Sequence, residues 1–314
     1  MKMKLNALIA AVAALASVGA HAALTVATNP GNSSVMFVAV DAQGTNGTTG
    51  GASNSITIDL GYLMTDFLAQ SGTQGLGANL VNAAGSLSSV GTTVVWDFKN
   101  NTTLVNGVAQ SANYQWSAQM ASFESAVSGI AGNSYTWGVI AADNFGGTTA
   151  SATNPVVNQN YLATGTPTFT GLTSGNVSTA ASRVNNFILS SNGTGTQLPG
   201  VVGANTATAG GAFLDSQLKG NFGGQTTAGW SYLTAVNSGA GFNWANQSAA
   251  SKVYSIGGTY SNTGVADTPA SFYFDAVNDT LTYTIAAVPE PGTYAMLMAG
   301  MVAVGFTIRR RAQR

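Results

Sequence analysis

The stretch SFYFDAVNDTLTYTI, residues 271–285, carries the clearest structural pattern in this chain. Apolar and polar residues alternate on both sides of Asn278-Asp279, which is typical of a β-hairpin that turns near that dipeptide. In its second half the apolar residues share one face and the threonines share the other: Leu281, Tyr283 and Ile285 against Thr280, Thr282 and Thr284. Because residues two apart lie on the same side of a strand, we expect one face of this hairpin in a core.

The same period of two predicts four more strands along the chain. They are SVMFVAVD (34–41), NSITIDLG (54–61), TTVVWDF (92–98) and SYTWGVIAAD (134–143). In the last of them Tyr135, Trp137 and Val139 fall on one face. The linkers are rich in Gly, Asn and Thr, and the longest loops are expected at 144–175 and 191–211.

Two stretches follow the period of an α-helix instead. The first is an apolar stripe with spacings of four, three, four and three residues, and Gly132 lies just past its end, where a C-terminal cap favours glycine. This stripe consists of Trp116, Met120, Phe123, Val127 and Ile130. The second stretch, 179–189, is weaker and carries Val184, Phe187 and Ile188.

Together these elements predict the fold class and the extent of the body. We expect a mainly β fold of the β-rich α+β kind, with a sandwich- or barrel-like body on which one or two helices pack. The body spans 23–287, which is long enough for one large domain or two small ones. A division into two subdomains would fall near 144–175.

The N-terminus has the features of a secretory signal peptide over residues 1–22. A positively charged start precedes an apolar run over 5–18, and Ala20 and Ala22 satisfy the small-x-small rule of signal peptidase. We therefore place the cleavage after Ala22 and expect export through the inner membrane.

The amino acids that the exported part lacks limit its chemistry. His21 is the only histidine and leaves with the signal peptide, and the chain has no cysteine. A Ser-His-Asp triad, a cysteine nucleophile, the usual His/Cys zinc sites and disulfides are thereby excluded. Neither a Gly-rich phosphate loop nor the aspartate spacing of a calcium loop occurs, so no cofactor and no metal are predicted.

Charge is scarce in the body. Charged residues make up 7% of the chain, against about 25% in an average soluble domain. Residues 23–288 hold four basic and ten acidic side chains, a formal net charge of −6, with no run of like charge. Because no basic patch is available to meet phosphates, we do not expect nucleic-acid binding.

The C-terminus carries a second targeting signal. Residues 292–308 contain no charge, and as a helix they would span about 25 Å, a short membrane span beside a hydrocarbon core of about 30 Å. Arg309, Arg310 and Arg311 follow, and the positive-inside rule places them in the cytoplasm. The body would then lie outside the inner membrane, as the signal peptide also requires.

A proline-acid-proline motif lies directly before this span. Two prolines around one residue prevent a helix and present an extended segment to a processing enzyme. The motif comprises Val288, Pro289, Glu290, Pro291 and Gly292. The order of motif, apolar span and arginine cluster over 288–314 resembles the PEP-CTERM sorting signal, whose tail is sometimes labelled an ice-binding protein C-terminal region. That label concerns the tail and carries no ice chemistry.

The resemblance implies a processing partner and a location. In that family an exosortase, a membrane-embedded enzyme similar to a cysteine transpeptidase, recognises the tail. The chain is thus similar to exported cargo of Gram-negative bacteria that make extracellular polysaccharide. This implies transient anchoring in the inner membrane and then release or transfer to the cell surface or the extracellular matrix of a biofilm. The alternative is a permanent C-terminal anchor.

A secreted, carboxylate-dependent glycosidase is one alternative for the body, because a pair of carboxylates is the simplest chemistry left. Glu124 is the only glutamate before the tail, and its partner could be Asp143 or Asp97. Phe123 and Val127, however, mark the buried side of that helix. We therefore expect Glu124 to face solvent without a catalytic role.

A carbohydrate-binding module of the extracellular matrix is the other alternative. The stretch GWSYLTAVNSGAGFNW, 229–244, gathers Trp230, Tyr232, Phe242 and Trp244, and aromatic faces suit sugar rings. Large aromatic residues more often fill a core, so Trp230, Tyr232 and Trp244 are glycan contacts only under this alternative. The threonines of 280–284 could be called an ice-binding face, but they are more simply the solvated face of an edge strand.

The prediction that follows is a non-enzymatic, exported protein of the cell surface or the exopolysaccharide matrix. Its expected partners are signal peptidase, an exosortase, the inner membrane in passing, and extracellular polysaccharide.

Overall fold

The fold comes from a computed structural model that describes the following parts of the chain: 24, 33–41, 54–67, 87, 89, 91–128, 135–143, 160–167, 174–193, 202–207, 230–246, 253–255, 270–286 and 301. The predicted signal peptide and its cleavage site, the sorting motif, the arginine cluster and, Met301 apart, the predicted span lie outside these residues. Within the described part, none of the helices combines the length and the apolar character that a membrane span needs.

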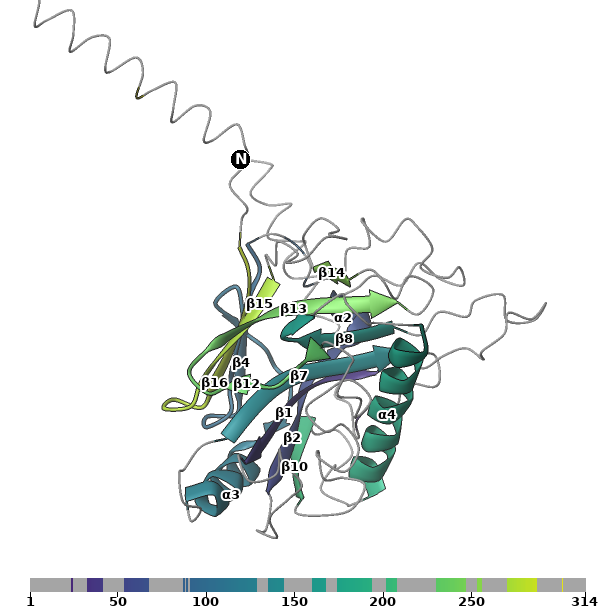
Figure 1. Cartoon of the computed structure of the whole chain (residues 1–314). Helices are drawn as coiled ribbons and strands as arrows, with labels where there is room; N and C mark the ends of the chain where they lie inside the picture. Colours follow the sequence, from purple (N-terminus) through teal and green to yellow (C-terminus); the bar gives the residue numbers. More distant parts are fainter. Residues whose placement is uncertain are drawn as a thin grey trace, which may run out of the picture.

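One long sheet forms the body and curls into an open, barrel-like wall (Figure 1). Its strands lie in the order β5 (Val108–Ala109), β4 (Thr102–Val105), β3 (Thr93–Asp97), β16 (Thr280–Ile285), β15 (Ala270–Asp275), β13 (Gly239–Asn246), β8 (Asn160–Thr164), β7 (Tyr135–Asp143), β1 (Ser34–Asp41), β2 (Ser55–Leu63), β10 (Val202–Ala207) and β6 (Tyr114–Gln115). β12 (Thr234–Ala235) joins β7, β14 (Val253–Ser255) joins β13, and β9 (Thr166–Pro167) pairs with β11 (Trp230–Ser231). The mainly β, barrel-like class is therefore confirmed.

β1 shows why the sheet has two cores. Every residue of β1 is buried, because β2 and β7 flank its edges and both of its faces are covered. Its alternate side chains belong to two separate hydrophobic clusters. The larger cluster, here called the inner core, contains Val35, Phe37 and Ala39. The other, here called the outer core, contains Met36, Val38 and Val40. An uninterrupted apolar run is typical of a strand that is buried on both faces.

The described part contains three helices, namely α2 (Met64–Phe67), α3 (Ser117–Ser128) and α4 (Ser174–Gly193). α4 packs on β7 and β8 and completes the outer core. α3 lies at the lower end of the sheet in Figure 1 and adds Met120, Phe123 and Val127 to the inner core. Both predicted helices are confirmed, although α4 is longer than the predicted stretch. Ile130 and the predicted cap at Gly132 lie outside the described residues.

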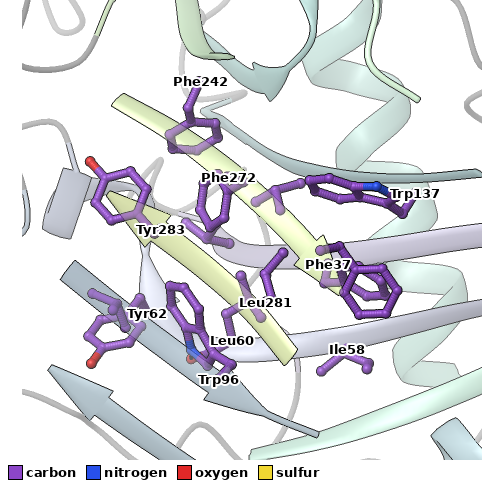
Figure 2. Packing of buried hydrophobic residues seen from close by; sticks show 14 of the residues in the cluster. Phe37, Ile58, Leu60, Tyr62, Trp96, Trp137, Phe242, Phe272, Leu281 and Tyr283 are labelled. Atoms are coloured by element: carbon purple, nitrogen blue, oxygen red, sulfur yellow. Dashed lines mark hydrogen bonds between the residues drawn. The ribbon is translucent and has the colours of Figure 1, made fainter. Parts of the chain in front are cut away.

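Aromatic rings fill the inner core (Figure 2). Phe37 contacts Phe98, Trp137 and Phe274, with ring-centroid distances of 5.1, 6.1 and 4.9 Å. These rings come from β1, β7, β15 and the residue after β3. The curl of the sheet is therefore held from inside by side chains that are distant in sequence.

A bulge in β2 provides a further link across the inner core. The register of β1 against β2 shifts near the start of β1, so that residues 60–62 are passed over. Gly61 has a φ of 77° there, which glycine adopts without steric cost. The indole Nε1 of Trp96 donates a hydrogen bond to the Leu60 carbonyl in this bulge at 2.8 Å, and Figure 2 shows the two residues side by side.

Along one edge, β7 meets first β12 and then β8, and Gly138 lies between the two contacts. A Cβ at Gly138 would lie 2.5 Å from the carbonyl oxygen of Tyr232 and 3.1 Å from Thr164 Oγ1. The Thr164 hydroxyl joins these segments, because it donates to the Tyr232 carbonyl and accepts from the Val139 N–H, both at 2.9 Å.

The structure also tests the predicted loops. The four predicted single strands are confirmed as β1, β2, β3 and β7, and the predicted hairpin as β15 and β16, with small shifts at their ends. The two long loops are wrong in part, because 144–175 contains β8, β9 and the start of α4, and 191–211 contains β10. The sequence of β10 shows little alternation of apolar and polar residues, so the local pattern does not predict it. It is a strand because it pairs with β2. Strands before 144, such as β7, and strands after 175, such as β10 and β13, belong to the one sheet.

Candidate functional site

Two neighbouring hairpins end in turns of the same sequence pattern. The β3–β4 turn reads DFKNNT over 97–102, and the β15–β16 turn reads DAVNDT over 275–280. In each turn the aspartate accepts a hydrogen bond from the side-chain amide of the asparagine three residues on, at 2.7 Å in both cases. The turns lie side by side because β3 pairs with β16.

The fifth residue of each turn, Asn101 and Asp279, has a φ of 54°. Asparagine and aspartate adopt this left-handed conformation more readily than other residues with a side chain. The conformation turns both side chains toward α3. Asn101 contacts the start of that helix, and Asp279 lies close enough to Glu124 within it for each side chain to shift the pKa of the other.

Asn101 supplies the N-terminal cap of α3 from a distant part of the chain. Its Oδ1 accepts hydrogen bonds from the backbone N–H groups of Trp116 at 2.6 Å and Ser117 at 3.0 Å. Its Nδ2 donates to Ser117 Oγ at 3.0 Å. The first N–H groups of a helix have no partner inside it, so this side chain fixes where α3 begins.

We expect Asn101→Ala to lower the free energy of unfolding by about 2–3 kcal/mol, from the lost cap and the strained backbone at positive φ. Asn101→Asp keeps the acceptor and tolerates the same backbone, so it should stay within about 0.5–1 kcal/mol of the wild type. Urea unfolding of the three purified proteins measures both. Equal losses in the two variants would contradict the capping role.

Glu124 and Asp279 form a carboxyl pair between α3 and the β15–β16 turn. Both side chains are half-buried. Burial, and after it the neighbouring Asp279 side chain, raises the pKa of Glu124 from 4.5 to about 7. Burial also raises the pKa of Asp279, although Glu124 and Lys99 act in the opposite direction.

Other ionisable groups surround the pair. The Lys99 ammonium lowers the pKa of both carboxyls, whereas Asp97 and Asp275 raise that of Asp279. Tyr135 lies on the inner side: burial, and then the charges of Glu124 and Asp279, raise the pKa of its phenol. Its buried hydroxyl makes no hydrogen bond. Besides burial and each other, Lys99 therefore acts on both carboxyls, and Asp97 and Asp275 act on Asp279.

The carboxyl that shifts the pKa of Glu124 is Asp279, which sequence reasoning missed. Of the two partners predicted from the sequence, Asp97 is engaged by Asn100 in its own turn. The side chain of the other, Asp143, lies outside the described residues. The repeated D-x-x-N-x-T pattern could have shown that the two turns are alike. It could not have shown which position of α3 lies beside either turn, because no local pattern encodes that.

Asp59 is a second titratable group with a raised pKa. It is fully buried in β2, and burial raises its pKa from 3.8 to about 7. Hydrogen bonds from the Gly61 N–H at 2.8 Å and from Ser34 Oγ at 3.4 Å offset part of this rise. These bonds stabilise the β2 bulge and give Asp59 a structural role.

The predicted glycan contacts are enclosed where the structure describes them. Tyr232 is 1% exposed, Trp244 is 2% exposed and Phe242 is fully buried, and the side chain of Trp230 lies outside the described residues. A ring in a core has no free face for a sugar, so this burial favours the packing role of the described rings.

The threonine row lies on the outer face of β16, as expected, but its predicted position in an edge strand is wrong. β16 lies between β3 and β15. The three threonines are partly buried and stand opposite Thr93, Val95 and Asp97 on β3. Only one of these three β3 residues is a threonine, so β3 does not continue the threonine row that an ice-binding face would need.

The targeting residues of the tail were identified by comparison with known proteins. Residues 287–311 match the family model of the PEP-CTERM protein-sorting motif. This match contains the predicted motif 288–292, the whole span 292–308 and Arg309 to Arg311. No curated protein and no solved structure matches the chain. The PEP-CTERM motif indicates an exported protein that an exosortase sorts at the membrane toward the cell surface.

Proposed function

We propose that this protein is a non-enzymatic component of the cell surface or of the exopolysaccharide matrix. The PEP-CTERM motif at 287–311 carries the proposal, because it directs the chain to an exosortase and hence out of the cell. The scarcity of charge and the wealth of small polar residues support a role among neutral, hydrated polymers.

The sorting step is tested by replacing Pro289, Glu290 and Pro291 with alanine in a host that carries the exosortase. We expect the wild type to begin at Ala23, to end near Pro289 and to leave the inner membrane. The triple variant should keep its tail and stay in the inner-membrane fraction. Intact mass and cell fractionation measure both, and Gln313→Ala is the matched control in the same tail.

A wild type that runs to Arg314 in the inner membrane would overturn the sorting part of the proposal and make the tail a permanent anchor. The non-enzymatic part is tested separately, by incubating the purified protein with exopolysaccharide isolated from the host. We expect no release of reducing sugars. Release that Glu124→Gln abolishes would replace the proposal with a hydrolase.

A further inference from the structure

We propose that the outer face of the β15–β16 hairpin binds a neutral, hydroxyl-rich polysaccharide, and that a sugar ring stacks on Tyr273. This surface would carry out the matrix function proposed above, on which the inference rests. Tyr273 is 45% exposed, and it is the one exposed aromatic ring among the side chains that the structure describes. A ring in solvent offers a free apolar face for a sugar, which the enclosed rings of 229–244 do not.

The alternation of β15 places Tyr273 on the outer side of the sheet (Figure 1). Phe272 and Phe274 belong to the inner core, and Tyr273 lies between them on the opposite face. Its cross-strand neighbours are Gly239 of β13 and Thr282 of β16. α4 covers the outer face further along the sheet, over β7 and β8. Tyr273 is therefore presented by a rigid hairpin and is held in the middle of a paired strand.

Glycines leave room beside the ring. Residues opposite each other in an antiparallel pair point to the same face, so a Cβ at Gly239 would stand next to Tyr273. It would meet only the Phe272 carbonyl oxygen, at 3.6 Å. Gly241 follows on the same face of β13, opposite Ser271. A sugar ring can therefore approach Tyr273 from the β13 side without displacing a side chain.

Hydroxyl groups lie on the other side of the ring. Thr282 is directly opposite Tyr273, and Ser271 precedes it on the same face, with its Oγ 3.3 Å from Thr284 Oγ1. These side chains are one strand spacing of about 4.8 Å or one two-residue step of about 7 Å from the tyrosine. A hydroxyl donates one hydrogen bond and accepts two, so Ser271 and Thr284 keep capacity for a ligand while they bond to each other. An apolar ring beside hydroxyls on a fixed strand matches the apolar faces and polar rim of a sugar.

The charges on this face favour a neutral ligand. Asp275 follows Tyr273 on the same face and stands opposite Thr280, which in turn stands opposite Asp97 of β3. An anionic polymer would bring like charges to these two carboxylates, and a second copy of this chain would bring the same two carboxylates again. Lys99 lies in the neighbouring turn, so acidic groups outnumber basic ones here. The neighbours of Tyr273 also lack the apolar core of a protein interface.

The test is affinity electrophoresis of the purified, exported protein in native gels that contain a dissolved polysaccharide. Three probes are used: neutral exopolysaccharide isolated from the host, neutral hydroxyethyl cellulose, and anionic alginate. We expect at least one of the two neutral polymers to retard the protein, and alginate not to retard it. The dependence of mobility on polymer concentration gives the apparent Kd.

Variants locate the binding surface. Tyr273→Ala removes the ring and should raise the apparent Kd about three- to tenfold, whereas Tyr273→Phe keeps the ring and should bind like the wild type. Gly239→Val fills the space beside the ring and should weaken binding as Tyr273→Ala does, while its unfolding midpoint stays unchanged because a β-branched residue suits this strand pair. Val277→Ala is the matched control, since Val277 is 78% exposed in the turn of the same hairpin. It should bind like the wild type.

The possible failures are distinguishable. Equal retardation of the wild type and Tyr273→Ala by a neutral polymer would overturn the inference and leave the proposed function standing, because the protein would bind the matrix elsewhere. Absence of retardation by both neutral polymers, or stronger retardation by alginate, would also overturn it; intact mass and cell fractionation then decide separately on the sorting part of the proposed function. A dimer in sedimentation experiments that Tyr273→Ala dissociates would assign the face to a second copy instead.

Discussion

Gly138→Ala is expected to destabilise the protein by about 3 kcal/mol or more, at the upper end of overpacking costs. The added Cβ would lie 2.5 Å from the Tyr232 carbonyl oxygen and 2.9 Å from a ring carbon of the same residue. A backbone oxygen cannot rotate away as the end of a side chain can. Relief would require β7 to separate from the segment before β12, with loss of the Thr164 hydroxyl bonds.

Gly239→Ala provides the matched control for this substitution. A Cβ at Gly239 would meet only the Phe272 carbonyl, at an ordinary 3.6 Å. Since alanine restricts the unfolded chain, this variant should be neutral or more stable by about 0.4–1 kcal/mol. Urea unfolding followed by circular dichroism measures both variants. Equal unfolding midpoints of the two variants would show that the backbone around Gly138 and Tyr232 shifts more easily than the short distances indicate.

Trp96→Ala should cost about 3–5 kcal/mol, the range for removal of a large buried aromatic residue. Trp96 is fully buried, stacks on Phe272 at 5.9 Å and meets Tyr62 edge-on at the same distance. Its loss would open the centre of the inner core and remove the hydrogen bond to the Leu60 carbonyl. The effect should appear as a lower unfolding midpoint and a lower melting temperature.

Trp96→Phe separates packing from hydrogen bonding at this position. A phenyl ring keeps the contact with Phe272 but has no N–H, so the Leu60 carbonyl in the bulge loses its donor. We expect a loss of about 1–3 kcal/mol, as for a buried acceptor left unsatisfied. If phenylalanine were as costly as alanine, the hydrogen bond would dominate; if it were harmless, packing alone would hold the bulge.

Particular elements show how far sequence reasoning reached. The β15–β16 hairpin was predictable because its alternation is local and its turn residues have a specific backbone preference. α3 was predictable because its apolar stripe follows the helical period. β10 and β8 were missed: β10 is made of small and polar residues, and both lie within segments assigned to loops. They are strands because partners in the sheet pair with them.

The sequence by itself determined that the tail carries a sorting motif and where the strands and helices with a strong local pattern lie, because such signals consist of neighbouring residues. Only the tertiary structure decided that β16 is an inner strand, that the described aromatic residues of 229–244 are core residues, and that Asp279 is the carboxyl that acts on Glu124. Each of these depends on which distant segments meet. The order of the strands in the sheet and the packing of the helices on it determine which segments meet. Both result from burial of apolar surface over the whole chain rather than from any local pattern.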